Sequence, residues 1–229
     1  MSDDTALEAF RLGDSFLPVG SYTVSSGLEQ FVQNDRIENA TDLEALLRTY
    51  LRQQVGRADL VALRAAHTGA RADDLDAVSA ADDRLAAVTL SAELRETAQR
   101  LGARLLSLER DLHDGGHVEA YAERVDAGAT PGTYAVVLGL TTGSAGIEER
   151  RACLLYCHGF TTGLVGSAQR LLSFGHTEAQ RLIDGLTPAM IAAVDTSEGR
   201  SLDSMDPFCP LVDILSAEHE RADRRLFVS

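Results

Sequence analysis

Apolar residues recur along most of this chain at intervals of three and four positions, the spacing of one face of an α-helix. One such stretch begins with Thr41 and Glu44, which have the spacing of an N-terminal capping box, and is expected to end at Gly56. Its apolar face consists of Leu43, Leu46, Leu47, Tyr50 and Leu51. No stretch alternates with a period of two, so the pattern predicts almost no β-sheet.

Three further stretches carry the same helical spacing. Residues 59–70 and 74–88 predict helices with acidic exposed faces, and a longer helix is expected to stop at Gly115 and Gly116. The apolar stripe of this longer helix consists of Leu90, Leu94, Leu101, Leu105, Leu108 and Leu112. Residues 128–132 and 197–210 are predicted to be loops.

Two segments in the middle of the chain, residues 133–147 and 152–169, carry no charged side chain. The second is long enough to raise the question of a membrane span, but its glycines, threonines and His158 make it too polar. Two adjacent buried helices fit better, with Gly159 and Gly163 allowing close approach of helix backbones. We therefore predict one compact all-α domain over residues 1–229, with about nine to eleven helices and two uncharged helices at its centre.

Acidic residues dominate the charge. The net charge is −14, with 35 acids against 21 arginines and no lysine. This balance argues against binding to nucleic acid or to an anionic membrane surface, which both require basic patches. It favours adaptation to high salt, where a short Debye length screens the repulsion between carboxylates. One acidic cluster lacks the central glycine and the final glutamate of a calcium loop and is expected on a solvated face; it contains Asp73, Asp74, Asp76, Asp82 and Asp83.

The chain begins without the basic region and apolar run of a signal peptide, and three cysteines are too few for a disulfide framework, so it is predicted to be cytoplasmic. It contains no phosphate-binding loop of the Gly-x-x-x-x-Gly-Lys type and no Gly-x-Ser-x-Gly elbow. Cys-x-x-Cys and His-Glu-x-x-His are absent as well. No catalytic set emerges, and we expect neither an enzyme nor a bound cofactor.

Cys153 and Cys157 share one helix face, with His158 beside the second. Thiolates and imidazole are ligands of Zn²⁺ or Ni²⁺, so a helical metal-binding enzyme using these three residues is the alternative hypothesis. Free cysteines are more often buried apolar fillers, and we favour that interpretation.

The last twenty residues combine a helix with an unusual tail. Pro210 suits a first helical turn, and Leu211, Ile214 and Leu215 continue one apolar face. Charged residues then take over, and the chain finishes on Leu226, Phe227 and Val228. An apolar tip behind a charged segment suggests docking, either on its own domain or on a partner.

The last twenty residues resemble the C-terminal segment of a known protein family. The pattern Pro-Leu-x-Asp-Ile-x-Ser-x-x-His-Glu, followed by Arg-Leu-Phe-x-Ser, is similar to the end of UreF-type urease accessory proteins. Its positions here are Pro210, Leu211, Asp213, Ile214, Ser216, His219, Glu220, Arg225, Leu226, Phe227 and Ser229. A second match near the other end comprises Pro18, Gly20, Tyr22, Gly27, Leu28 and Glu29. The chain departs from the family pattern at Ala217, Glu218 and Val228, where arginines often stand at the last two.

The resemblance implies a non-catalytic scaffold for nickel insertion into apo-urease. Such a protein bridges a UreD/UreH-type accessory protein and a UreG-type GTPase, commonly as a homodimer within the complex. It implies no metal ligand in this chain. The residues it assigns to partner binding are Pro18, Gly20, Tyr22, Glu29, Asp213, His219, Glu220, Arg225, Leu226 and Phe227. Two interpretations remain open for the N-terminal match. Its residues either form turns and pack in the interior, or they shape a surface that displays Tyr22 and Glu29 to a partner. The resemblance favours the second interpretation for some of them. A helical scaffold for unrelated partners is a third possibility.

Overall fold

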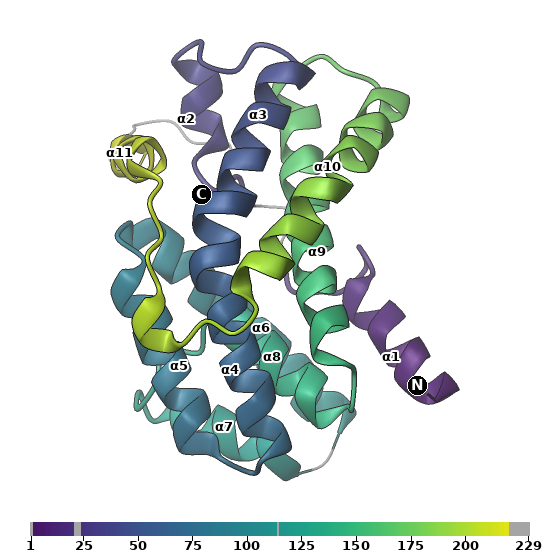
Figure 1. Ribbon diagram of the computed structural model, residues 1–229, viewed down its shortest axis with the longest axis vertical. Helices are drawn as coiled ribbons and strands as arrows, with labels where there is room; N and C mark the ends of the chain where they lie inside the picture. Colours follow the sequence, from purple (N-terminus) through teal and green to yellow (C-terminus); the bar gives the residue numbers. More distant parts are fainter. Residues whose placement is uncertain (1, 21–23, 114, 220–229) are drawn as a thin grey trace.

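The computed structural model describes residues 2–20, 24–113 and 115–219, and within these residues it contains helices and no strand (Figure 1). The α-helices are α1 (Asp3–Gly13), α2 (Leu28–Gln33), α3 (Ala40–Tyr50), α4 (Leu60–Arg71), α5 (Leu75–Val88), α6 (Ala92–Leu112), α7 (Gly116–Asp126), α8 (Tyr134–Ser144), α9 (Glu149–Leu171), α10 (His176–Ser197) and α11 (Pro210–His219). A π-helix, η2 (Leu51–Asp59), and a 3₁₀ helix, η3 (Leu202–Ser204), complete the set. The predicted all-α fold is confirmed.

Helices α3 and α4 join through η2 into one rod that runs along most of the long axis of the molecule (Figure 1). The expected end of the first helix at Gly56 is therefore wrong. A β-carbon at Gly56 would lie 2.9 Å from the carbonyl oxygen of Ala193 in α10. This glycine allows close approach of a neighbouring helix and does not terminate its own.

The start of the rod also differs from the prediction. Asn39, and not Thr41, is the N-cap of α3, because its side-chain oxygen accepts hydrogen bonds from the backbone N–H groups of Thr41 (2.9 Å) and Asp42 (3.1 Å). The cap thus lies two residues before the expected capping box. Asparagine is among the preferred N-cap residues, since its short side chain reaches these unpaired donors.

Helix α8 lies at the centre, as predicted for the first uncharged segment. Every residue from Ala135 to Gly143 is buried. The helix packs directly on α4, since a β-carbon at Gly139 would lie 2.3 Å from the carbonyl oxygen of Leu63. One at Gly143 would lie 2.7 Å from that of His67. These two glycines set the distance between the central helices.

The second uncharged segment forms α9, but this helix is not buried all round. His158, Gly159 and Gly166 are exposed, while Cys157 and Thr161 face the core. No atom lies within 4 Å of a β-carbon built on Gly159 or Gly163, apart from their own chain neighbours and helix backbone. The expected close helix approach at these glycines is therefore wrong.

The leucine stripe predicted for the longer helix is buried only in its middle. Ser91 caps the helix, so Leu90 lies outside it and is 71% exposed. Leu105 is fully buried against the core, whereas Leu112 at the other end is 52% exposed. Helix α6 thus extends beyond the elements that cover its centre.

One member of the acidic cluster is not solvated. The Asp82 side chain is fully buried, and its carboxylate accepts hydrogen bonds from Tyr121, Thr130 and Thr133 and from two backbone N–H groups. The remaining four members are exposed, as expected. Burial of an ionised group requires this number of donors, so Asp82 organises the loop between α7 and α8.

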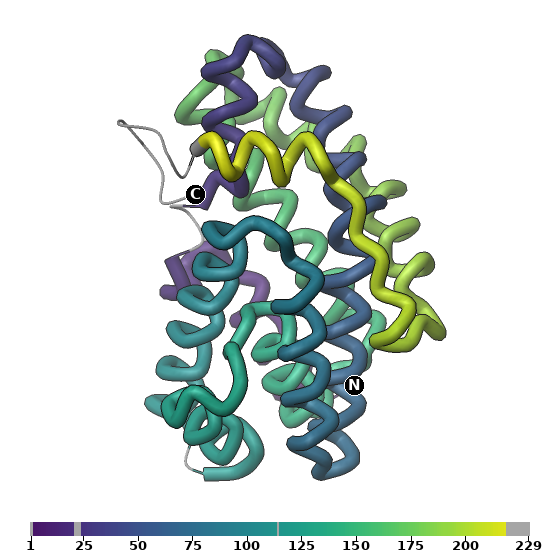
Figure 2. The backbone as a smooth tube through the Cα atoms, turned by 90° about the vertical axis from the view of Figure 1, so that its left-hand side faces the viewer, coloured from purple at the N-terminus to yellow at the C-terminus, as the bar shows by residue number. Residues whose placement is uncertain are grey.

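Helix α11 runs across the long axis of the molecule, next to α2 (Figure 2). The chain between α10 and α11 follows the rod and donates a hydrogen bond of 3.2 Å from the Phe208 N–H to the carbonyl oxygen of Gln53. In the described part of the chain, no helix is long and apolar enough to cross a membrane.

Candidate partner-binding site

The N-terminal match contains a loop whose shape depends on Gly20. This residue is buried and has φ +80°, and a β-carbon there would lie 1.8 Å from Nη1 of Arg104. The same Arg104 nitrogen donates a 3.2 Å hydrogen bond to the carbonyl oxygen of Val19. Only glycine satisfies both the backbone angle and the space. Pro18 is exposed beside it, and Tyr22 lies outside the described residues.

Gly27 is the N-cap of α2 and has φ +81°, and a β-carbon there would lie 3.0 Å from Oγ of Ser216 in α11. Glu29, two residues later, is only 1% exposed and accepts a 3.0 Å hydrogen bond from Nε2 of Gln33. The expected display of Glu29 at the surface is therefore wrong. The Glu29 carboxylate is buried and bonded within α2.

The structure brings parts of the N-terminal and C-terminal matches together, where α2 lies next to α11. Besides the approach of Gly27 to Ser216, the Nδ2 atom of Asn34 donates a 3.3 Å hydrogen bond to the Glu218 carboxylate. The N-terminal and C-terminal matches were separate patterns in the sequence. In space their described parts meet where α2 and the residue before it lie against α11.

Two residues outside both matches hold this region in place. The Tyr50 hydroxyl donates a hydrogen bond to the carbonyl oxygen of Ser26, and the Ser167 hydroxyl donates one of 2.7 Å to that of Val24. Burial raises the pKa of Tyr50, so its hydroxyl remains a donor. Sequence reasoning placed Tyr50 only on an apolar helix face, and no local signal indicated its long-range contact.

Helix α11 has one buried and one exposed face. Val212 and Leu215 pack into the protein, whereas Leu211 is 41% and Ile214 56% exposed. Phe208, just before the helix, is 70% exposed. An apolar strip therefore leads along α11 toward the C-terminus.

The structure describes only some of the predicted site residues of the C-terminal match. Asp213 is half-buried at the edge of a cavity, and burial raises the pKa of its carboxyl. His219 ends α11, and its side chain lies outside what the structure describes. Glu220, Arg225, Leu226 and Phe227 lie outside the described residues as well.

The two cysteines of the metal hypothesis are buried, as the filler interpretation predicts. Cys153 and Cys157 are fully covered, and burial raises the pKa of Cys153 to about 12 and that of Cys157 further. A metal ligand must be a thiolate, which this environment disfavours. His158 is exposed and so lies on another face of α9.

Among the described residues, the only group with metal-ligand spacing is Glu8, Glu109 and His113, whose ligand atoms lie within 4.8 Å of one another. Arg11 already bridges the two carboxylates: it pairs with Glu8 and lies 2.6 Å from Oε1 of Glu109. The guanidinium neutralises the charge that a metal ion would need. This cluster fastens α1 to α6.

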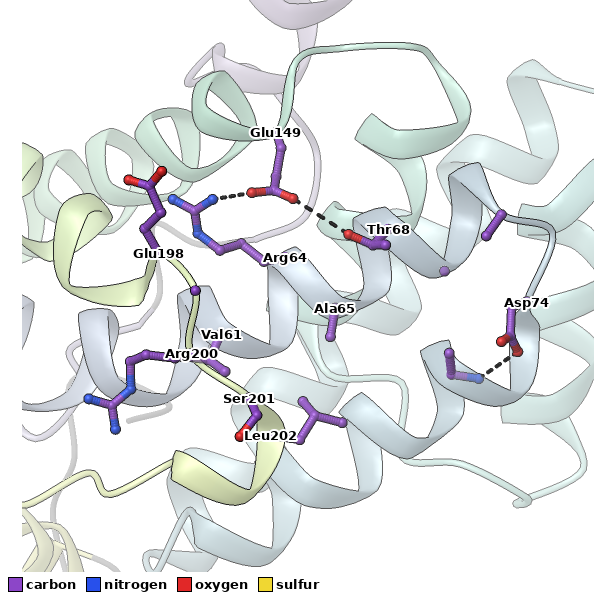
Figure 3. Close-up of a pocket in the computed structure, with 14 residues that line it drawn as sticks. Val61, Arg64, Ala65, Thr68, Asp74, Glu149, Glu198, Arg200, Ser201 and Leu202 are labelled. Carbon is purple, nitrogen blue, oxygen red and sulfur yellow. Dashed lines mark hydrogen bonds and ion pairs between the residues drawn. The ribbon is translucent and has the colours of Figure 1, made fainter.

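A cavity of about 500 Å³ lies between α4, the start of α9 and the chain after α10 (Figure 3). Two of its charged groups, Arg64 and Glu149, are paired with each other. Arg64 pairs with Glu149 and donates hydrogen bonds to Ser197 (2.9 Å) and to the carbonyl oxygen of Val194 (3.1 Å). Thr68 contacts the second oxygen of Glu149 at 3.5 Å. This network ties three helices together and presents no free charge from Arg64.

Comparison with known protein families matches UreF over residues 37–187. Curated relatives match over nearly the whole chain. A urease accessory protein UreF of Trichodesmium erythraeum is 32% identical over 97% of this chain and 96% of its own. UreF 1 of Brucella melitensis is 30% identical over 97% and 92%, and UreF of Yersinia enterocolitica 29% identical over 99% of both. The chain therefore belongs to the UreF family of urease accessory proteins.

Proposed function

We propose that this protein is the non-catalytic scaffold for nickel insertion into apo-urease. In this function it bridges a UreD/UreH-type accessory protein and a UreG-type GTPase in the cytoplasm, as a homodimer within the complex. Membership in the UreF family carries the proposal, since the match extends over almost the entire chain. Nickel is here the cargo of the assembly and not a resident cofactor of this chain.

We assign the UreD/UreH-type partner to α11 and the residues that follow it. The support is the apolar strip formed by Phe208, Leu211 and Ile214, since exposed apolar side chains in a row mark interaction surfaces. The sequence continues with Leu226 and Phe227, which can extend the same surface. The opposite face of α11 is anchored through Val212 and Leu215, so the strip has a rigid base.

The loop before α2 adjoins α11, and we include its exposed Pro18 in the same surface. Phe16, which is 92% exposed, lies two residues earlier. Gly20 and Glu29 contribute indirectly, because both are buried: Gly20 shapes the loop, and Glu29 lies in the first turn of α2. Tyr22, Asp213, His219, Glu220 and Arg225 remain proposed contacts on the strength of the family resemblance.

Two changes test this surface. Deletion of Arg221–Ser229 and the substitution Ile214→Glu should each weaken binding to the purified UreD/UreH-type partner by at least tenfold, measured by calorimetry in molar KCl. Ile191→Glu is the matched control, because Ile191 is 41% exposed on α10, away from α11. Circular dichroism should show an unchanged helical fold for all three variants.

Urease activation provides the second readout. In cells that contain the other accessory proteins, both changes should abolish activation, while Ile191→Glu should retain it. If the truncated chain and Ile214→Glu bind the partner as tightly as the full-length protein, the assignment of this surface is wrong.

A further inference from the structure

A cavity of about 610 Å³ opens between the loop after α1, helices α6 and α9, and α11. This volume lies in the range of ligand-binding cavities. Most of its wall is apolar and includes Leu17, Leu101, Leu155, Phe160 and Val212. A cavity of this size with apolar walls can accept several side chains of another molecule.

Two carboxylates lie in this apolar cavity. Asp59, at the junction of η2 and α4, accepts hydrogen bonds from the Tyr156 hydroxyl and, at 3.5 Å, from Nε2 of Gln54. Asp213 reaches the cavity from α11. Within the described part of the chain, neither carboxylate has an arginine or histidine at ion-pair distance, unlike Glu109 or Glu149. The hydrogen-bond partners of the Asp59 carboxylate are both neutral donors.

Both carboxylates are partly removed from solvent. Burial raises the pKa of Asp59 to about 6, even though its two hydrogen bonds act in the opposite direction. Burial also raises the pKa of Asp213. The Cys209 thiol experiences both charges: burial raises its pKa to about 11, with Asp213 and Asp59 adding to the effect. Asp59, Cys209 and Asp213 all line this same cavity.

A single metal ion does not fit this arrangement. The ligand atoms of Asp59, Cys209 and Asp213 do not gather within 4.8 Å of one another, a spacing that the described residues reach only at Glu8, Glu109 and His113. Spread negative charge inside apolar walls matches instead a larger cation on an apolar stem. Arginine and lysine side chains have this composition, because their methylene groups lie on apolar surface while the charged end reaches a polar group.

We propose that this cavity receives an arginine or lysine side chain of a partner protein, carried on a segment whose flanking apolar residues pack on the cavity wall. The cation pairs with Asp59 and is supported by Asp213, which removes the cost of an unpaired buried carboxylate. This inference rests on the proposed function, since it names the chemistry by which a partner is recognised.

The cavity wall contains other charged groups besides Asp59 and Asp213. Arg95 donates hydrogen bonds to the carbonyl oxygens of Thr89 (2.5 Å) and Leu90 (2.8 Å). Arg170 donates one of 3.1 Å to Ser167, and His158 and Asp14 are exposed. Arg95 is thus directed at neutral backbone oxygens, and Arg170 has a partner within its own helix.

A matched pair of peptides tests the proposal on the full-length protein: acetyl-Leu-Arg-Phe-amide and acetyl-Leu-Gln-Phe-amide. Tyrosine emission reports on the cavity, because Tyr50, Tyr134 and Tyr156 line it and the chain contains no tryptophan. Calorimetry gives the affinity. We expect the arginine peptide to bind at least tenfold more tightly than the glutamine peptide.

The substitution Asp59→Asn should abolish this preference for arginine. Asp184→Asn, the same change at an exposed position of α10, should preserve it. Equal binding of the two peptides to the unsubstituted protein would overturn the proposal, and so would a preference that persists in Asp59→Asn. The outcome is separable from the proposed function: a cavity that prefers arginine in a protein that does not activate urease would refute only the latter.

Discussion

The Tyr121 hydroxyl of α7 donates a hydrogen bond of 2.6 Å to the Asp82 carboxylate of α5, and both side chains are fully buried. The same carboxylate accepts hydrogen bonds from the Thr130 hydroxyl (3.0 Å) and from the N–H of Thr133 at the start of α8 (2.9 Å). Burial, reinforced by the Asp82 charge, raises the pKa of Tyr121, which keeps its hydroxyl a donor. One carboxylate therefore joins α5, α7 and α8.

Removal of this carboxylate should be costly. In Asp82→Ala, several buried donors lose their acceptor, and each unsatisfied group costs about 1–3 kcal/mol. We expect the free energy of unfolding to fall by at least about 3 kcal/mol in urea denaturation. Asp83→Ala is the control, because Asp83 is exposed next to it in the same helix and should change stability by less than about 0.5 kcal/mol. Similar effects of the two substitutions would contradict the role given to Asp82.

Substitution by alanine should change the stability of the protein in opposite directions at two glycines of the uncharged helices. Gly139→Ala places a β-carbon 2.3 Å from the carbonyl oxygen of Leu63, so α4 and α8 must separate. We expect a loss of about 1–3 kcal/mol from this overpacking. Gly159→Ala meets no atom within 4 Å and should stabilise α9 by about 0.5–1 kcal/mol through its higher helix propensity. Thermal unfolding followed by circular dichroism measures both, and an equal loss at the two positions would be inconsistent with these contacts.

Asp59 should make stability depend on pH. Its pKa is about 6 in the folded protein, above the value of about 3.9 for an unfolded chain, so the folded state holds this proton more tightly. The resulting stability is fully present below about pH 4 and is lost as pH rises through 6, on the order of 3 kcal/mol at most. In Asp59→Asn this pH-dependent loss of stability is absent, because asparagine does not ionise. The stability difference between the variant and the unsubstituted protein should therefore grow from pH 4 to 7 in urea denaturation, and a constant difference would disprove the raised pKa.

The excess of acids predicts a response to salt. Thirty-five acids and twenty-one arginines leave a net charge of −14, and the repulsion is screened over about 3 Å in 1 M salt. The melting temperature should rise with KCl up to molar concentrations. A melting temperature that stays flat or falls over this range would reject adaptation to high salt.

The buried cysteines test the metal-enzyme alternative. Cys153→Ala/Cys157→Ala should lower the free energy of unfolding by roughly 1–3 kcal/mol, because two small cavities replace two buried sulfur atoms. The double substitution should leave urease activation intact in a cell with the full accessory set. Metal analysis of the purified protein is decisive: about one Zn²⁺ or Ni²⁺ per chain, lost with the double substitution, would establish the alternative.

The sequence by itself determined the helical class and the family. Periodic leucines such as Leu43 and Leu47 identify the buried face of a helix, because the period of 3.6 residues depends only on the local chain. The absence of charge identified α8 as the central helix for the same reason: its surroundings admit no solvated group on any side. The patterns at the two ends of the chain were sufficient for the family.

Only the tertiary structure decided what each polar or small residue does. Gly56 and Gly139 allow neighbouring backbones to approach, and nothing in their local sequence distinguishes this from a helix end or a flexible position. Asp82 is buried although the neighbouring Asp83 is exposed, because the donors to its carboxylate come from distant parts of the chain. The contact of Gly27 with Ser216 joins the two matched ends of the chain. A local pattern records which face of a helix is covered, whereas the identity of the covering group depends on distant parts of the chain.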